Sequence, residues 1–164
     1  MQITRAGEYG VLGLLHLARQ GAERMVMIDE VSREEKIPKS FLAKIFQSLG
    51  KAGLVRSYRG AGGGFALVRK PEEITVLQII EAIEGKIAFQ RCLQEVPDCE
   101  HMDGCALCGL FEQAQDRVKE VFARTSLADL LKSQVSVGAS HRRASKPNRS
   151  PAGMPVTLRE TWKL

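Results

Sequence analysis

The feature that most constrains the fold is a change in hydrophobic period near Gly53. Before this glycine, apolar residues recur at the three- and four-residue spacing of amphipathic helices. After it they form two short runs, 54–58 and 65–69, which are typical of strands. The glycine-rich stretch 60–64 between the runs can form a hairpin tip, because glycine adopts positive φ without strain. Helices followed by a glycine-tipped β-ribbon indicate a winged helix-turn-helix over residues 1–71.

Three helices are predicted in this first region. The first spans 5–19, and a short second helix begins near Asp29, which we expect to be its N-cap, and ends near Lys36. The third runs from about 38 to 52, with Pro38 in its first turn and Gly53 ending it. The residues of the third helix that we expect to face inward are Phe41, Leu42, Ile45, Phe46 and Leu49.

The second half of the chain begins with a helix that Thr75 is expected to cap and Gly85 to end. A loop over 89–109 then holds all four cysteines, and a longer helix is predicted from Leu110 to about Ala123. A short helical segment follows near Leu127. Beyond residue 134 the composition shifts to Ser, Arg, Lys, Pro and Gly, which predicts a disordered basic tail over 135–164.

The net charge of +5 is distributed unevenly along the chain. Residues 1–71 hold twelve Lys and Arg against six Asp and Glu, residues 72–135 hold six against twelve, and residues 136–164 hold six against one. A basic first region joined to an acidic middle suggests a nucleic-acid-binding domain with a sensing or dimerising segment. No apolar run approaches the roughly 20 residues that span a membrane, and no signal peptide is visible, so we expect a cytoplasmic protein.

The third helix carries the residues expected to read DNA. Lys39, Ser40, Ala43, Lys44 and Gln47 occupy its outward positions. The Ser40 and Gln47 side chains can pair with base edges or phosphates in the major groove, whereas Lys39 and Lys44 would neutralise phosphates. The alternative is that this face is simply exposed to solvent and has no role in binding. The short helix before it and the β-ribbon after it favour the DNA-reading interpretation over this alternative.

The ribbon itself offers a second set of DNA contacts. Arg59 starts the glycine-rich tip and could enter a minor groove, where a narrow groove concentrates negative potential. Arg56 and Arg69 flank the ribbon and could bind phosphates. No Lys-Ser or Lys-Thr follows the glycines and no helix opens after them, so a nucleotide-binding loop is excluded.

The cysteines Cys92, Cys99, Cys105 and Cys108 form a C-x6-C-x5-C-x2-C pattern. In a reducing compartment such a cluster indicates metal binding or redox chemistry rather than structural disulfides. The spacing fits an iron–sulfur cluster with four cysteine ligands, and it also fits a tetrahedral zinc site. His101 lies inside the loop and could substitute as a ligand.

Several segments together resemble a known family. They are 37–42, 49–55, 57–67, 75–77, Glu84-Gly85 and the cysteine loop. These segments are similar to the Rrf2 family of winged-helix transcription regulators, and to its IscR-, NsrR- and RirA-type iron–sulfur members. The resemblance covers about residues 1–133.

The resemblance implies a homodimer packed through the helix that begins near Leu110, with an iron–sulfur cluster near the dimer interface. Cys92, Cys99 and Cys105 match the three cysteine ligands of the family. The fourth ligand is either Cys108, where IscR-type members have histidine, or Glu8, where NsrR-type members take a carboxylate from the partner subunit. The residues Ala43 and Lys44 depart from the IscR pattern, so the IscR operator sequence does not carry over.

The resulting expectation is a mainly α protein with a small β-wing. It has a winged helix-turn-helix domain over 1–71, a cluster-binding loop and dimerisation helix over 72–134, and the tail. We expect a transcriptional regulator and not an enzyme. It would bind palindromic operator DNA as a homodimer and act as a repressor. A [2Fe-2S] or [4Fe-4S] cluster would report iron or cluster status, redox state or nitric oxide. The alternatives are a zinc or thiol-redox regulator of the same fold and a small iron–sulfur electron carrier.

Overall fold

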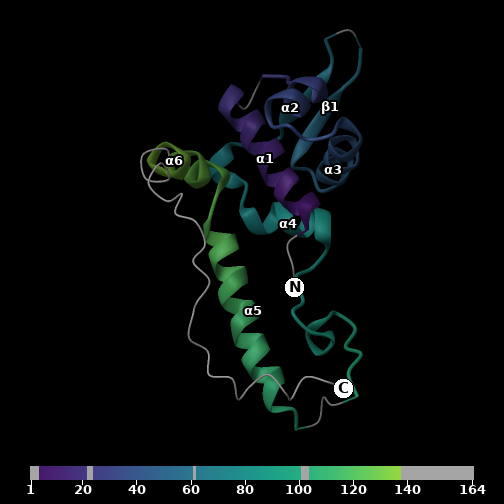
Figure 1. Ribbon diagram of the computed structural model, residues 1–164, viewed down its shortest axis with the longest axis vertical. Helices are drawn as coiled ribbons and strands as arrows, with labels where there is room; N and C mark the ends of the chain where they lie inside the picture. The colour runs from purple at the N-terminus through teal and green to yellow at the C-terminus, as the bar shows by residue number, and fades with distance from the viewer. Residues whose placement is uncertain (1–3, 22–23, 61, 101–103, 138–164) are drawn as a thin grey trace, which may run out of the picture.

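The computed structural model of the protein describes residues 4–21, 24–60, 62–100 and 104–137. Helices from both halves of the chain pack into a head, from which one long helix extends with a loop beside its far end (Figure 1). We call residues 4–88 and 125–137 the head and residues 89–124 the arm. The elements are α1 (Arg5–Gln20), α2 (Ile28–Glu34), α3 (Lys39–Lys51), β1 (Val55–Tyr58), β2 (Gly64–Leu67), the 3-10 turn η1 (Pro71–Glu73), α4 (Val76–Glu84), the 3-10 turn η2 (Arg91–Leu93), α5 (Ala106–Arg124) and α6 (Leu127–Val137). The expected mainly α fold with a small β-wing is confirmed.

The wing is an antiparallel pair in which Val55 lies opposite Leu67 and Tyr58 lies opposite Gly64. Val26 adds a bridge to Phe65, with backbone hydrogen bonds of 2.9 Å in both directions. A side chain at Gly64 would place its Cβ 2.5 Å from the Val26 carbonyl oxygen. Glycine is therefore required at this position, because the backbones approach too closely for any other residue.

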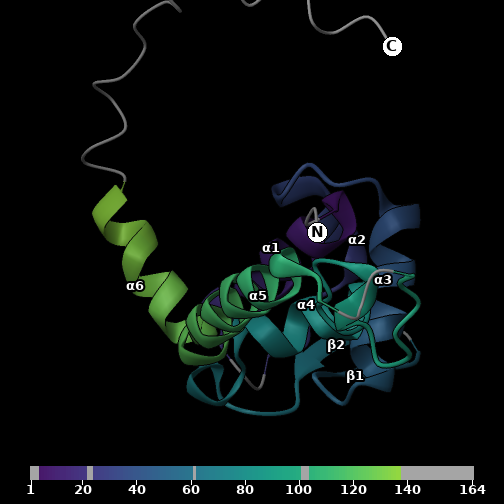
Figure 2. The same ribbon diagram turned by 90° about the horizontal axis from the view of Figure 1, so that it is seen from below.

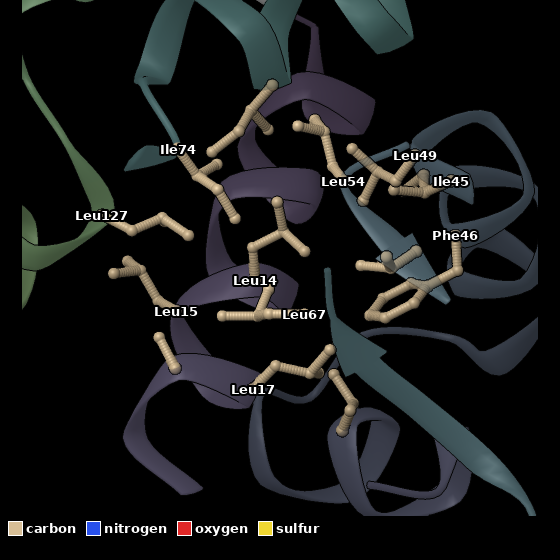
Figure 3. Packing of buried hydrophobic residues seen from close by; sticks show 14 of the residues in the cluster. Leu14, Leu15, Leu17, Ile45, Phe46, Leu49, Leu54, Leu67, Ile74 and Leu127 are labelled. Carbon is tan, nitrogen blue, oxygen red and sulfur yellow. The ribbon is translucent and has the colours of Figure 1, made fainter. Parts of the chain in front are cut away.

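The main core surrounds α1, whose apolar residues at helical spacing meet α3, the wing and α6 (Figure 3). Leu14 of α1 and Leu127 of α6 are fully buried, and Phe46 of α3 is 1% exposed. A Cβ at Gly13 would lie 2.9 Å from the Phe46 ring, so a glycine in α1 allows this close contact. Burying each such side chain contributes about 1.5–3 kcal/mol, and this shared core holds α3 and the wing at a set angle.

A second apolar cluster lies where the arm meets the head. Val76, Ile80 and Ile87 are buried there, with Phe89 and Phe122 packed against them. The helix α4 starts with a capping box, in which the Thr75 and Gln78 side chains each accept a backbone N–H of the other residue. Figure 2 shows α5 leaving this junction and α6 diverging from its end.

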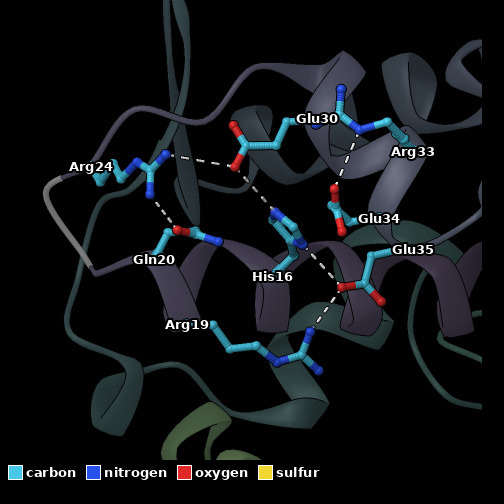
Figure 4. Close-up of polar contacts among 8 residues, drawn as sticks. All are labelled: His16, Arg19, Gln20, Arg24, Glu30, Arg33, Glu34 and Glu35. Atoms are coloured by element: carbon cyan, nitrogen blue, oxygen red, sulfur yellow. Dashed lines mark hydrogen bonds and ion pairs between the residues drawn. The ribbon is translucent and has the colours of Figure 1, made fainter.

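A polar network joins α1 to α2 inside the head (Figure 4). The His16 ring is 4% exposed, and its Nδ1 lies 3.0 Å from the Glu35 carboxylate. Arg19 donates to the same carboxylate oxygen at 2.8 Å. The His16 Nε2 is buried without a hydrogen-bond partner, 3.9 Å from the Glu30 carboxylate. These contacts hold α2 against α1, and they add to the apolar packing between the helices.

Two expectations for the head are wrong. Asp29 is not an N-cap, because α2 begins at Ile28 with Met27 as its cap and no side-chain cap bond. The bridge at Val26 keeps the chain extended, so the helix starts directly after it. Phe41 does not face inward: it is 55% exposed and packs edge-to-face on Tyr9, with ring centroids 6.4 Å apart.

The arm also differs from expectation, because α5 begins at Ala106 rather than at Leu110. Gly104, with φ of 81°, turns the chain into the helix, and Cys105 is the N-cap. Cys108 therefore lies in the first turn of α5 and not in a loop. At the other end α6 runs to Val137, so residues 135–137 are helical and not part of the predicted tail. The rest of that tail, residues 138–164, lies outside the described residues.

Candidate DNA-binding surface and cysteine site

The helix α3 exposes one polar face to solvent. Ser40, Lys44 and Gln47 are exposed there together with Ala43, on the side opposite the buried Leu42, Ile45, Phe46 and Leu49. Pro38 is the N-cap of α3 and not, as predicted, a residue of its first turn, so the helix begins at Lys39. Small, polar and basic side chains near the start of a helix are what a major groove requires.

A groove of about 600 Å³ separates α3 from the wing. Ala43 and Gln47 line its α3 side, and Arg56 and Ser57 line its β1 side. The structure therefore brings a predicted helix residue, Gln47, and a predicted wing residue, Arg56, to the same surface. Arg59 is exposed directly after β1, at the start of the tip, whereas Arg69 is half-buried. A polar helix face and wing arginines around one groove can contact bases and phosphates together.

The predicted phosphate contact at Lys39 has a partner that sequence reasoning missed. Its ammonium lies 2.6 Å from the carboxylate of Asp29 on α2, and the side chains are 58% and 64% exposed, respectively. The pair joins the first turns of the two helices. Spacing along the chain carries no signal for it, because the contact depends on the angle between α2 and α3.

A second missed contact caps the start of α1. The Glu84 carboxylate, at the end of α4, accepts the Thr4 hydroxyl at 2.5 Å and the Gly7 N–H at 3.1 Å. A negative charge at a helix N-terminus is favourable, because the exposed N–H groups there carry partial positive charge. The bond fixes the first turn of α1, where Glu8 is exposed.

The four cysteines all lie among the described residues, and each is a free, half-buried thiol. The thiol of Cys92 lies beside that of Cys108. This neighbour, partial burial and the nearby Cys105 and Glu112 raise the pKa of the Cys108 thiol above its ordinary value. The structure thus brings Cys92, Cys105 and Cys108 into one neighbourhood at the far end of the arm.

The donor set fits an iron–sulfur cluster in its chemistry, since cysteine sulfurs are the usual ligands of these clusters. In the part of the chain that the structure describes, no three His, Cys, Asp or Glu side chains gather closely enough to hold one metal ion. His101, the other ligand candidate in the loop, lies outside the described residues.

The helix α5 carries apolar side chains that the head does not cover. Leu107 is 57% exposed, and Leu110 and Val121 are each 60% exposed. Ala114 and Val118 are half-buried. Much of this apolar surface of α5 therefore has no partner among the described residues.

Comparison with known proteins gives consistent matches. The family model Rrf2, described as an iron-dependent transcriptional regulator, matches residues 3–133. The transcriptional regulator IscR of Xenorhabdus nematophila is 32% identical over 155 residues, which cover 94% of each chain. Among the described residues, no helix combines the length and the apolar character that crossing a membrane requires.

Solved structures of similar fold include two regulators. One is CymR of B. subtilis, the global cysteine regulator, with a TM-score of 0.68 and 29% identity, covering 81% of this chain and 98% of CymR. The other is IscR of T. potens, with a TM-score of 0.66 and 28% identity, covering 90% of this chain and 94% of IscR.

Proposed function

This chain belongs to the Rrf2 family of transcriptional regulators, and we propose that it is a cytoplasmic repressor that binds palindromic operator DNA as a homodimer under the control of an iron–sulfur cluster. As a DNA-binding transcriptional regulator it is not an enzyme. One observation carries the proposal for DNA: the polar face of α3 and the wing arginine Arg56 border the same groove.

The roles of the DNA-contacting residues follow from their chemistry. Ser40 and Gln47 would meet base edges or phosphates in the major groove, and Lys44 would neutralise a phosphate. Arg59 would enter the flanking minor groove, because the glycines beside it let the backbone come close to DNA. Arg56 would bind a phosphate between the two grooves, and Lys39 would do the same once it leaves Asp29.

The uncovered face of α5 supports the homodimer. Leu110 and Val121 are too exposed for apolar residues of one helix face, unless a second copy covers them. A two-fold axis relating two heads would then place two α3 helices in successive major grooves, about 34 Å apart. Palindromic operators follow from that symmetry.

The cysteines would couple cluster occupancy to this geometry. Cys92, Cys99, Cys105 and Cys108 would hold the cluster, with Glu8 of a partner subunit as the alternative to Cys108. When bound, the cluster supplies an iron centre that responds to oxidants, nitric oxide or iron supply. Cys108 is on α5 and Cys92 is in the loop, so ligation by both ties the loop to the helix. DNA affinity changes only if the tied arrangement and the free arrangement differ in how they hold the two α3 helices.

The test is replacement of Cys92 by alanine in protein purified without air. The expected result is loss of visible absorbance and of iron, with altered operator binding. The variant Ser133→Ala, a surface change on α6, is the control. Unchanged iron content and unchanged operator binding in Cys92→Ala contradict the proposal. A colourless wild-type protein that contains zinc supports the zinc alternative.

The closeness of the Cys92 and Cys108 thiols favours a second candidate, a thiol-redox regulator of the same fold. Two adjacent thiols can form a disulfide when an oxidant such as peroxide accepts their electrons. This candidate predicts that metal-free protein changes its operator affinity on oxidation and recovers on reduction. The cluster proposal predicts that metal-free protein does not respond.

A further inference from the structure

Gln115 is unusual among the residues of α5. In this helix of 19 residues, all of which the structure describes, Gln115 is the buried one, and it is polar. It is 6% exposed, and its side-chain carbonyl accepts the backbone N–H of Phe89 at 3.0 Å. The bond joins two segments that are 26 residues apart in the sequence.

Phe89 marks the start of the cysteine loop. Just before it, Ile87 is 3% exposed in the apolar cluster between head and arm, and the Phe89 ring packs against that cluster. Three residues after Phe89, Cys92 lies in the turn η2, which packs against α5. Fixing the Phe89 backbone therefore limits where Cys92 can lie.

Gln115 and Cys108 share a face of α5. They are seven residues apart, which is two turns of helix and a rise of about 10 Å. The loop, held at Gln115 by its first residue, can thus run along the helix toward Cys108. The packing of η2 against α5 and the closeness of the Cys92 and Cys108 thiols are consistent with that path.

We propose that Gln115 is a positioning residue that sets the register of the cysteine loop on α5 and so brings Cys92 to Cys108. The inference deepens the proposed function, because the loop so placed is the candidate cluster site. The physical basis is that a part-buried N–H left without an acceptor is unfavourable, so the loop prefers the one register in which Gln115 accepts it.

A disulfide-trapping experiment tests this register without any cluster. In the full chain, Cys99→Ser and Cys105→Ser leave Cys92 and Cys108 as the two thiols. Diamide takes up the two thiol hydrogens as the disulfide forms, and mass spectrometry follows the rate. In this background Gln115→Leu should slow disulfide formation by roughly tenfold, the effect expected for one lost hydrogen bond to a buried group.

Two further variants separate positioning from general packing. Gln113→Leu makes the same chemical change on an exposed position of α5, and it should leave the rate unchanged. Gln115→Glu keeps an oxygen acceptor, and it should restore most of the rate. Equal rates in Gln115→Leu and Gln113→Leu would overturn the inference.

Amide hydrogen exchange gives a measurement on the unmodified chain, which holds even if Gln115→Leu fails to fold. The Phe89 N–H should exchange at least tenfold more slowly than the N–H of Glu95, an exposed residue of the same loop. Exchange at the same rate would overturn the inference.

If trapping slows as expected but wild-type protein never takes up iron, then the proposed function fails and the positioning role stands. If wild-type protein takes up iron but trapping does not slow, then only the positioning role fails.

Discussion

The head and the arm are stabilised in different ways. In the head, α1 and α3 bury large apolar side chains such as Leu14 and Phe46 almost completely. In the arm, the 19 residues of α5 bury only Gln115. The candidate DNA-binding surface thus rests on a dense core, whereas the cysteine loop is held to α5 by the hydrogen bond from Phe89 to Gln115, the packing of η2 and the apolar junction around Ile87.

This difference shows which part of the molecule can respond to a signal. Regions with few buried apolar contacts open at low free-energy cost, while a packed core opens only with global unfolding. A ligand or a second copy can therefore change the order of the arm without disturbing α3 and the wing. In the proposed function, the head would bind DNA in a fixed geometry, and changes in the arm would control that binding.

The largest expected effect compares one residue type in both regions. Leu14→Ala should lower the free energy of unfolding by about 3–5 kcal/mol, because it removes a fully buried side chain and leaves a cavity. Leu110→Ala, at a position 60% exposed, should change it by about 0.5 kcal/mol or less in dilute monomer. Urea unfolding followed by circular dichroism measures both values.

Protein concentration sharpens this comparison. If α5 forms the dimer interface, the destabilisation by Leu110→Ala should grow as protein concentration rises, because association stabilises the wild type. The effect of Leu14→Ala should persist at every concentration. A large, concentration-independent loss in Leu110→Ala would show that the arm is part of the monomer core.

The next prediction tests whether DNA binds to the head and not to the arm. Arg59→Ala should weaken operator binding by about 1–3 kcal/mol, since the wing tip loses its proposed minor-groove contact. Arg117→Ala removes an arginine of the arm that pairs with Glu120, and it should leave operator affinity unchanged. Fluorescence anisotropy on a labelled operator, at several salt concentrations, gives both affinities. Equal losses in the two variants would mean that the arm also contacts DNA.

A smaller effect, of opposite sign, is expected at Asp29. Its carboxylate forms an ion pair with the Lys39 ammonium, and it would repel a nearby phosphate. Asp29→Asn should therefore raise operator affinity by about threefold, the range of an exposed ion pair. The salt dependence should steepen by about one released counterion. Combining it with Lys39→Met should remove most of the gain, and weaker binding by Asp29→Asn alone would contradict the explanation.

The smallest effect concerns the cap at the start of α6, where the chain returns from the arm to the head. The Ser126 hydroxyl and N–H donate to the Asp129 carboxylate at 2.6 and 3.0 Å, and these bonds lower the pKa of Asp129 from its ordinary 3.8. The contribution of this cap is complete above the ordinary pKa and is lost as pH falls through the lower, folded value. The Tm difference between wild type and Asp129→Asn should thus be constant above about pH 5 and shrink below about pH 4. A difference that stays constant down to pH 3 would exclude this origin.

Much of the fold was predictable because its signals are local. The spacing of apolar residues located α1, α3 and α4, the glycines near 60–64 located the wing, and Thr75 correctly marked the start of α4. The outward residues of α3 followed from the same periodicity, so Ser40, Lys44 and Gln47 are exposed as expected. Such signals lie within one or two turns of chain, where backbone geometry alone relates the side chains.

Contacts between distant segments were not accessible in this way. The pairs Asp29 with Lys39, Glu84 with Thr4, and Gln115 with Phe89 depend on how helices pack against each other. The start of α5 at Ala106, which moves Cys108 onto the helix, and the outward turn of Phe41 toward Tyr9 depend on it as well. Amino-acid order thus specified which elements form and which faces are apolar, since both follow from neighbours along the chain. Which side chains meet across elements was decided by the packing of the whole core, because small changes in helix angle move side chains by more than the length of a hydrogen bond.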